Sequence, residues 1–111
     1  NLKQSNVYTR IYRLNTDLYN FSNEKVYTGY FRIIFKDSPS NSSVRFRVTD
    51  NNNRNITLEE NNQIVQSNMV VKFKTINYTP LLDLNCKITE SNMVIESISM
   101  FAEGSYVKGL L

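Results

Sequence analysis

The chain has 111 residues, of which 41% are hydrophobic and 21% are charged, so it fits one globular domain and is too apolar for a disordered one. Its net charge of +3 is mildly basic, well below the dense Lys and Arg clustering of a dedicated nucleic-acid binder. The lack of histidine excludes Ser-His-Asp and Cys-His catalysis and His-based zinc sites, and a single cysteine excludes an internal disulfide.

The N-terminal part predicts one strand. Val7 to Leu14 alternates between apolar and polar residues and is rich in Tyr, which favours extended structure. The next segment, Asn15 to Phe21, has apolar residues at a spacing that fits either a helical turn or a loop. We therefore expect one domain, with an N-terminal strand and connecting segment at 1–24 and a body at 25–111.

Two strands with a clear two-residue period come next. The first runs from Val26 to Lys36, and turn residues around Pro39 end it. Its core-facing residues are Tyr27, Gly29, Phe31, Ile33 and Phe35. The second runs from Ser43 to Asp50, with Val44, Phe46 and Val48 turned inward. The Asn-rich segment from Asp50 to Asn55 predicts a loop.

The remaining elements are also strands. Short strands are expected at Ile56 to Leu58 and at Ile64–Val65, and a longer one at Met69 to Asn77. The next runs from Leu82 to Ile88 and includes Cys86 on its apolar parity, which indicates a small buried hydrophobe rather than a reactive thiol. The last elements are a strand at Met93 to Phe101, whose alternation slips near Ser97 as at a β-bulge, and a short strand or tail at Tyr106 to Leu111.

About eight short strands separated by turns every 8 to 12 positions predict an all-β domain, either a two-sheet antiparallel β-sandwich or a barrel, with little or no helix. No apolar run approaches the roughly 18 residues of a membrane-spanning helix, so we expect no membrane insertion. Asn1 is not an initiator Met and no signal-like leader follows it. We expect a piece of a longer protein.

A set of cations provides the main candidate binding site. They occupy outward positions of three predicted strands: Arg32, Arg45, Arg47, Lys72 and Lys74. If these strands are neighbours, they form one basic face able to hold acidic sugars, phosphates or an acidic protein. The alternative is that outward charges are merely solvated and protect the sheet from aggregation.

Two tyrosines are candidate stacking surfaces for sugar rings or protein partners. Tyr30 lies next to Arg32 in the sequence pattern, and Tyr78 lies beside the turn at Pro80, so both have polar neighbours. The other tyrosines fit half-buried strand positions, for which Tyr has a high propensity.

Groups for catalysis or metal binding are sparse. Glu59 and Glu60 are adjacent acids, but neighbouring residues of a strand point to opposite faces, which favours a solvated pair over a catalytic one. The loop at Asp50 to Asn53 has oxygen ligands that suit Ca²⁺ but lacks the spacing of a dedicated site. We expect no enzyme activity, no cofactor and no metal.

Part of the sequence resembles jelly-roll domains that are similar to carbohydrate-binding modules and occur in phage tail fibres and virion spikes. The likeness runs from Tyr27-Thr28-Gly29-Tyr30-Phe31-Arg32-Ile33 to the closing segment that ends Met100-Phe101-Ala102-Glu103-Gly104. The Trp that often stacks on sugars in such modules is absent. The resemblance implies a two-sheet sandwich without a catalytic site.

We therefore expect a non-catalytic structural or attachment module of a phage or virion protein, located in the virion or outside the cell. It would contact other virion subunits or itself, for example as a homotrimer, and its expected ligand is an anionic glycan or cell-wall polymer. One alternative is a basic β-barrel that binds nucleic acid through the same residues. Another is the sugar-targeting module of an extracellular enzyme.

Overall fold

A computed structural model describes residues 4–15, 28–37, 43–58, 63–64, 68–74, 80–88, 93–102 and 108–109 of the chain. Regular secondary structure in these segments consists of strands only: β1 (Thr9–Asn15), β2 (Thr28–Asp37), β3 (Ser43–Thr49), β4 (Gln63–Ile64), β5 (Asn68–Lys74), β6 (Leu81–Ile88), β7 (Val94–Ala102) and β8 (Lys108–Gly109). The predicted all-β class is confirmed. No helix in the described segments could cross a membrane. The segment from Asn15 to Phe21, expected as a helical turn or a loop, lies outside them, apart from Asn15, which ends β1.

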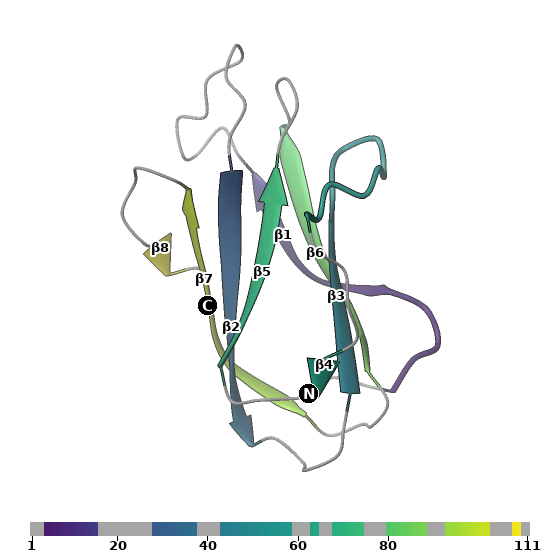
Figure 1. The fold of residues 1–111 in the computed structure, drawn as a ribbon, viewed down its shortest axis with the longest axis vertical. Coiled ribbons are helices and arrows are strands. Elements are labelled where there is room, and N and C mark those ends of the chain that lie inside the picture. The colour runs from purple at the N-terminus through teal and green to yellow at the C-terminus, as the bar shows by residue number, and fades with distance from the viewer. Residues whose placement is uncertain are drawn as a thin grey trace.

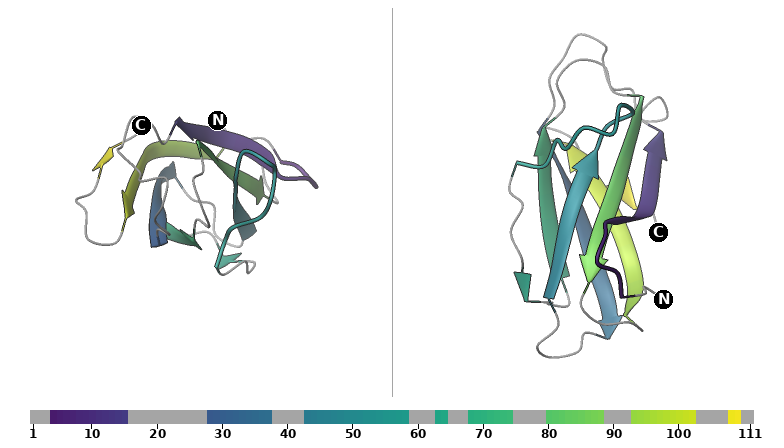
Figure 2. Two further views of the ribbon diagram at one scale, coloured as in Figure 1. Left: turned by 90° about the horizontal axis from the view of Figure 1, so that it is seen from above. Right: turned by 90° about the vertical axis from the view of Figure 1, so that its right-hand side faces the viewer.

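The strands form two antiparallel sheets that face each other, in agreement with the predicted β-sandwich (Figures 1 and 2). The strand order is β1-β6-β3-β4 in the first sheet and β5-β2-β7-β8 in the second. Because β4 and β8 have two residues each, every sheet consists of three long strands and one short edge strand.

Consecutive long strands always belong to different sheets. β1, β3 and β6 lie in the first sheet, and β2, β5 and β7 lie in the second. Each long-strand pairing (β1 with β6, β3 with β6, β2 with β5 and β2 with β7) therefore joins the first half of the chain to the second half.

The core lies between the sheets and is built from the inward residues of the long strands. Burial alternates with period two, most regularly along β5 and β6. Its largest fully buried side chains are Phe31, Phe35, Phe73, Leu14, Ile33, Leu82, Leu84, Met93 and Ile98. Cys86 belongs to the same cluster and is 4% exposed, which confirms that it is a buried hydrophobe.

Gly29 occupies the one described inward position of β2 that has no side chain, directly opposite Phe73 of β5. A Cβ atom on Gly29 would lie 2.5 Å from Cζ of the Phe73 ring, which is closer than two carbon atoms can approach. The ring of Phe73 also packs against Phe31, with 5.3 Å between the ring centroids. The glycine is therefore required by the position of this ring.

The predicted slip of alternation near Ser97 is a β-bulge in β7. Ile34 of β2 pairs with Ser97, but the next residue, Phe35, pairs with Ile95, so Glu96 has no partner of its own on β2. The extra residue explains why the apolar residues on the two sides of this point do not share one register.

Residues 55–58 link the edges of the two sheets. The backbone N–H of Ile56 donates to the carbonyl oxygen of Val48 in β3 (2.9 Å), and the N–H of Lys74 in β5 donates to the carbonyl oxygen of Ile56 (3.0 Å). The short strand predicted at Ile56 to Leu58 is thus a bridge between β3 and β5, with isolated pairs on both sides.

Candidate functional site

The predicted cationic residues do not share one face. Arg45 and Arg47 lie on β3 in the first sheet, whereas the other candidates lie on β2 and β5 in the second sheet: Tyr30, Arg32, Lys72 and Lys74. Outward side chains of two packed sheets point in opposite directions, so the expected single basic face is replaced by two separate ones. Tyr78 lies outside the described residues.

On the second sheet, the ring of Tyr30 is enclosed by its two cross-strand neighbours. The Phe101 ring stacks on it with a centroid distance of 4.6 Å and an angle of 16° between the ring planes. The amino group of Lys72 lies 5.5 Å from the Tyr30 centroid. A sugar ring would have to displace one of these partners, so Tyr30 does not form the open stacking surface that we expected.

The two other predicted cations of this sheet, Arg32 and Lys74, also have uncharged residues as their cross-strand partners. Arg32 lies between Val70 and Ser99, and its Nε atom is buried without a hydrogen-bond partner. Lys74 is exposed and pairs with Thr28 at the end of β2.

The first sheet gathers a larger set of polar side chains, which we call the β3–β6 face: Tyr8, Arg45, Arg47, Asn85 and Lys87. Arg45 lies directly opposite Lys87 and Arg47 directly opposite Asn85, because β3 and β6 pair in register. Among the described outward positions of these two strands, Asp83 is the one acid.

Asp83 is neutralised by a neighbour on β1. The Nε and Nη2 atoms of Arg13 donate to the two carboxylate oxygens of Asp83, at 2.7 and 2.9 Å. This bidentate pair raises the pKa of Arg13 above its ordinary value through the hydrogen bond to Asp83. Because the Asp83 carboxylate is paired in this way, the β3–β6 face is positively charged.

Tyr8 lies across the β3–β6 face. The Cζ atom of Arg47 is 4.1 Å from the centroid of its ring, and the amino group of Lys87 is 5.4 Å from it. The chain before Tyr8 runs beside β6, where the N–H of Ser5 donates to the carbonyl oxygen of Ile88 (3.3 Å). Sequence reasoning missed this role of Tyr8, because no local pattern links residue 8 to strands that begin more than thirty positions later.

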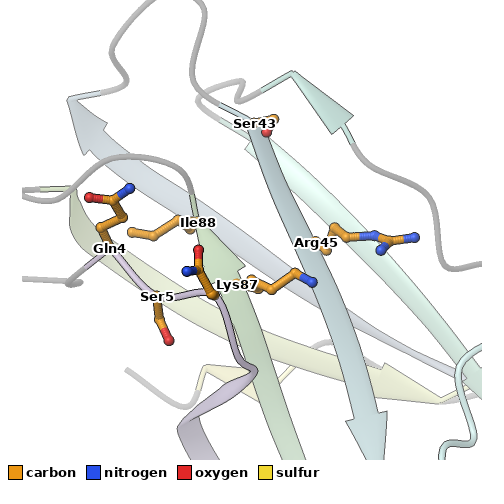
Figure 3. Close-up of a pocket in the computed structure, with 7 residues that line it drawn as sticks. Gln4, Ser5, Ser43, Arg45, Lys87 and Ile88 are labelled. Atoms are coloured by element: carbon orange, nitrogen blue, oxygen red, sulfur yellow. The ribbon is translucent and has the colours of Figure 1, made fainter.

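Two pockets open along this face. The first has a volume of about 380 Å³ and is lined by Gln4, Ser5, Asn6, Ser43, Arg45, Lys87 and Ile88. In Figure 3 the Lys87 side chain reaches from β6 toward β3, and Arg45 extends from β3 on the other side of that strand. The Nε atom of Arg45 is buried without a hydrogen-bond partner.

The second pocket has a volume of about 300 Å³ and is lined by Tyr8, Arg47, Thr49, Asn53, Asn55 and Asn85. It is rich in amides, which can both donate and accept hydrogen bonds. Asn85 is held in place because its Nδ2 atom donates to Oγ1 of Thr49 (3.1 Å) and to the carbonyl oxygen of Arg47 (3.3 Å).

The loop beside the second pocket is organised by the carboxylate of Asp50, which is 4% exposed. Its Oδ1 atom accepts from the backbone N–H groups of Asn52 and Arg54, and its Oδ2 atom accepts from Nε of Arg54, each at 2.9 Å. Burial alone would raise the pKa of Asp50, but these donors lower it below its ordinary value. Both carboxylate oxygens of Asp50 therefore accept hydrogen bonds from the loop itself.

The described segments contain no cluster of three or more acidic or Cys side chains placed to hold a metal ion. The acid pair Glu59–Glu60 lies outside those segments. No protein-family model, curated protein or solved structure matches this chain. The β3–β6 face supplies cations that can bind anionic groups and amides that can form hydrogen bonds with hydroxyl or acyl groups.

Proposed function

We propose that this chain is a non-catalytic attachment module of a virion or other extracellular protein and binds an anionic surface glycan through the β3–β6 face. The observation that carries the proposal is that cations line two pockets on one sheet: Lys87 lines the first pocket, and Arg47 lines the second together with Tyr8, whose ring both cations contact. A face that has two pockets, cations and several amides suits a polymer that carries both acidic and hydroxyl groups.

The fold we infer within the β-sandwich class is jelly-roll-like. The support for this is that consecutive long strands alternate between the two sheets, so that the chain wraps around the core instead of forming hairpins. Such a scaffold leaves the outer face of a sheet available for a ligand, because its inner face supplies the core.

An acidic glycan is favoured over nucleic acid by the state of the aromatic rings. Single-stranded nucleic acid binds by stacking bases on open aromatic faces. The ring of Tyr8 already contacts Arg47 and Lys87, and the ring of Tyr30 already contacts Phe101 and Lys72. The β3–β6 face therefore presents cations and amides to a ligand, and not open aromatic rings on which bases could stack.

The experiment compares binding of dextran sulfate and uncharged dextran by isothermal titration calorimetry at low salt. We expect affinity for dextran sulfate only, decreasing as salt screens the charges. The variant R45Q/K87Q should lose at least about tenfold in affinity, which corresponds to 1.4 kcal/mol. The matched control, K72Q/K74Q, removes the same charge from the other sheet and should bind like the unaltered chain.

Equal loss in both double variants would mean that only net charge matters, and it would contradict a site on the β3–β6 face. No binding to dextran sulfate would also defeat the proposal. Tighter binding to single-stranded poly(U) than to dextran sulfate would favour the nucleic-acid alternative instead.

A further inference from the structure

We infer that the β3–β6 face binds two adjacent units of its polymer in two different pockets. The first pocket binds an anionic unit, and the second binds a neutral unit that bears hydroxyl or acetamido groups. This inference rests on the proposed function and specifies its ligand. The preferred glycan would then alternate acidic and neutral sugars, instead of carrying a charge on every unit.

The two pockets follow one another along the same pair of strands. On β3, Ser43 and Arg45 line the first pocket, and Arg47 and Thr49 line the second. A strand advances about 3.3 Å per residue, so Ser43 and Thr49 are separated by roughly 20 Å. An extended oligosaccharide lying along β3 can therefore reach both pockets at once.

The lining of the two pockets differs in charge. The described residues around the first pocket include Lys87 and Arg45, which are cross-strand partners, and no acid. Those around the second are mainly amide and hydroxyl side chains, together with Arg47, whose guanidinium lies over the Tyr8 ring. A carboxylate or sulfate is better satisfied in the first pocket, and hydroxyl or acetamido groups are better satisfied in the second.

The second pocket is held in shape before any ligand arrives. Asn53 has a φ of 60°, a left-handed conformation that Asn tolerates, and its N–H donates to the carbonyl oxygen of Asp50 (3.0 Å). The Oδ1 atom of Asn55 accepts from the N–H of Thr57 (3.0 Å) and from its hydroxyl (2.7 Å). The backbone of Asn53 and the side-chain amide of Asn55 are therefore fixed before binding, so less conformational entropy is lost on binding, which favours selective recognition.

The test compares hyaluronan oligosaccharides, in which glucuronate alternates with a neutral N-acetylated sugar, with oligogalacturonates of equal length, which carry a carboxylate on every unit. We expect hyaluronan to bind about three- to tenfold more tightly although it has fewer charges, the effect of roughly one net hydrogen bond. Isothermal titration calorimetry at two salt concentrations measures both affinities.

Two variants distinguish the contributions of the two pockets to binding. Asn53→Gly keeps a backbone that adopts positive φ and removes the amide, so it should abolish the preference for hyaluronan without altering the salt dependence. Lys87→Gln should weaken both ligands and reduce the salt dependence. Asn51→Ala, an exposed change in the same loop outside both pocket linings, serves as the control and should behave like the unaltered chain.

Oligogalacturonate binding at least as tightly as hyaluronan, or a preference that survives Asn53→Gly, would overturn the two-pocket inference. Binding to dextran sulfate would still stand in that case, so the proposed function would survive. Absence of binding to all three polymers would instead remove the proposed function itself.

Discussion

The guanidinium of Arg47 lies over the ring of Tyr8, with 4.1 Å between Cζ and the ring centroid, and thereby joins the N-terminal segment to the third strand of the chain. Lys87 approaches the same ring from β6. The three side chains come from three separate parts of the sequence, so each contact contributes to the docking of residues 4–8 on the first sheet.

Replacement of Tyr8 by Leu should lower the free energy of unfolding by about 0.5 to 1 kcal/mol for each of the cation–π interactions that the ring makes, because apolar bulk remains but the aromatic face does not. Urea denaturation followed by circular dichroism measures the change. Tyr8→Phe keeps the ring and should retain most of the stability. Equal destabilisation by Leu and Phe would assign the effect to the hydroxyl instead of to the ring.

Replacement of Gly29 by Ala should destabilise the domain by about 1 to 3 kcal/mol, because the added methyl group meets the fully buried ring of Phe73. Guanidinium chloride denaturation of Gly29→Ala, Phe73→Leu and the double variant tests this. The double variant should be less destabilised than the sum of the single ones, since the smaller side chain removes the clash. Strict additivity would contradict the contact.

The buried carboxylate of Asp50 should make stability depend on pH. Because its pKa is lowered in the folded state, its contribution is present above the ordinary value near 4 and disappears as the pH falls through the lowered value. Asp50→Asn should cost about 1 to 3 kcal/mol at pH 7, with a difference that narrows below about pH 4. Melting temperatures of both proteins from pH 7 to pH 2.5 check this, and a constant difference would contradict it.

Cys86 should be unreactive in the folded protein. Burial raises its pKa to about 11, and the thiolate is the form that reacts with aromatic disulfide reagents. Labelling at pH 8 should therefore be slow in buffer and fast in urea above the unfolding midpoint, followed by absorbance of the released thiolate. Rapid, complete labelling in buffer would show that the first sheet opens without global unfolding.

Much of the fold follows from local pattern. The two-residue period of Phe31, Ile33 and Phe35 identified both a strand and its inward face, and the interrupted period around Ser97 located the bulge. These features depend on neighbouring residues of one strand, so the sequence alone is enough to find them.

The arrangement of the candidate site could not be found in this way. The pattern showed that Arg45 and Lys72 point outward, but not that their strands belong to opposite sheets. The same limit applies to Lys87: the alternation of its strand places it on the polar side, but it does not show that Lys87 lies directly opposite Arg45. Contacts between distant strands depend on topology, and alternation within one strand contains no information about it.

The pairing of each long strand with a strand from the other half of the chain has a consequence for synthesis and assembly. A cut in the loop between Asn51 and Asn52 would leave β1, β2 and β3 on one polypeptide and β5, β6 and β7 on the other, and each of the four described ladders between long strands would then join the two polypeptides. Each piece alone should stay unfolded, because none of the described ladders between long strands lies within one piece, whereas mixing the two pieces should restore both sheets by complementation. During synthesis on the ribosome, β1, β2 and β3 cannot form their ladders until β5, β6 and β7 have emerged. We therefore expect this domain to fold slowly for its length.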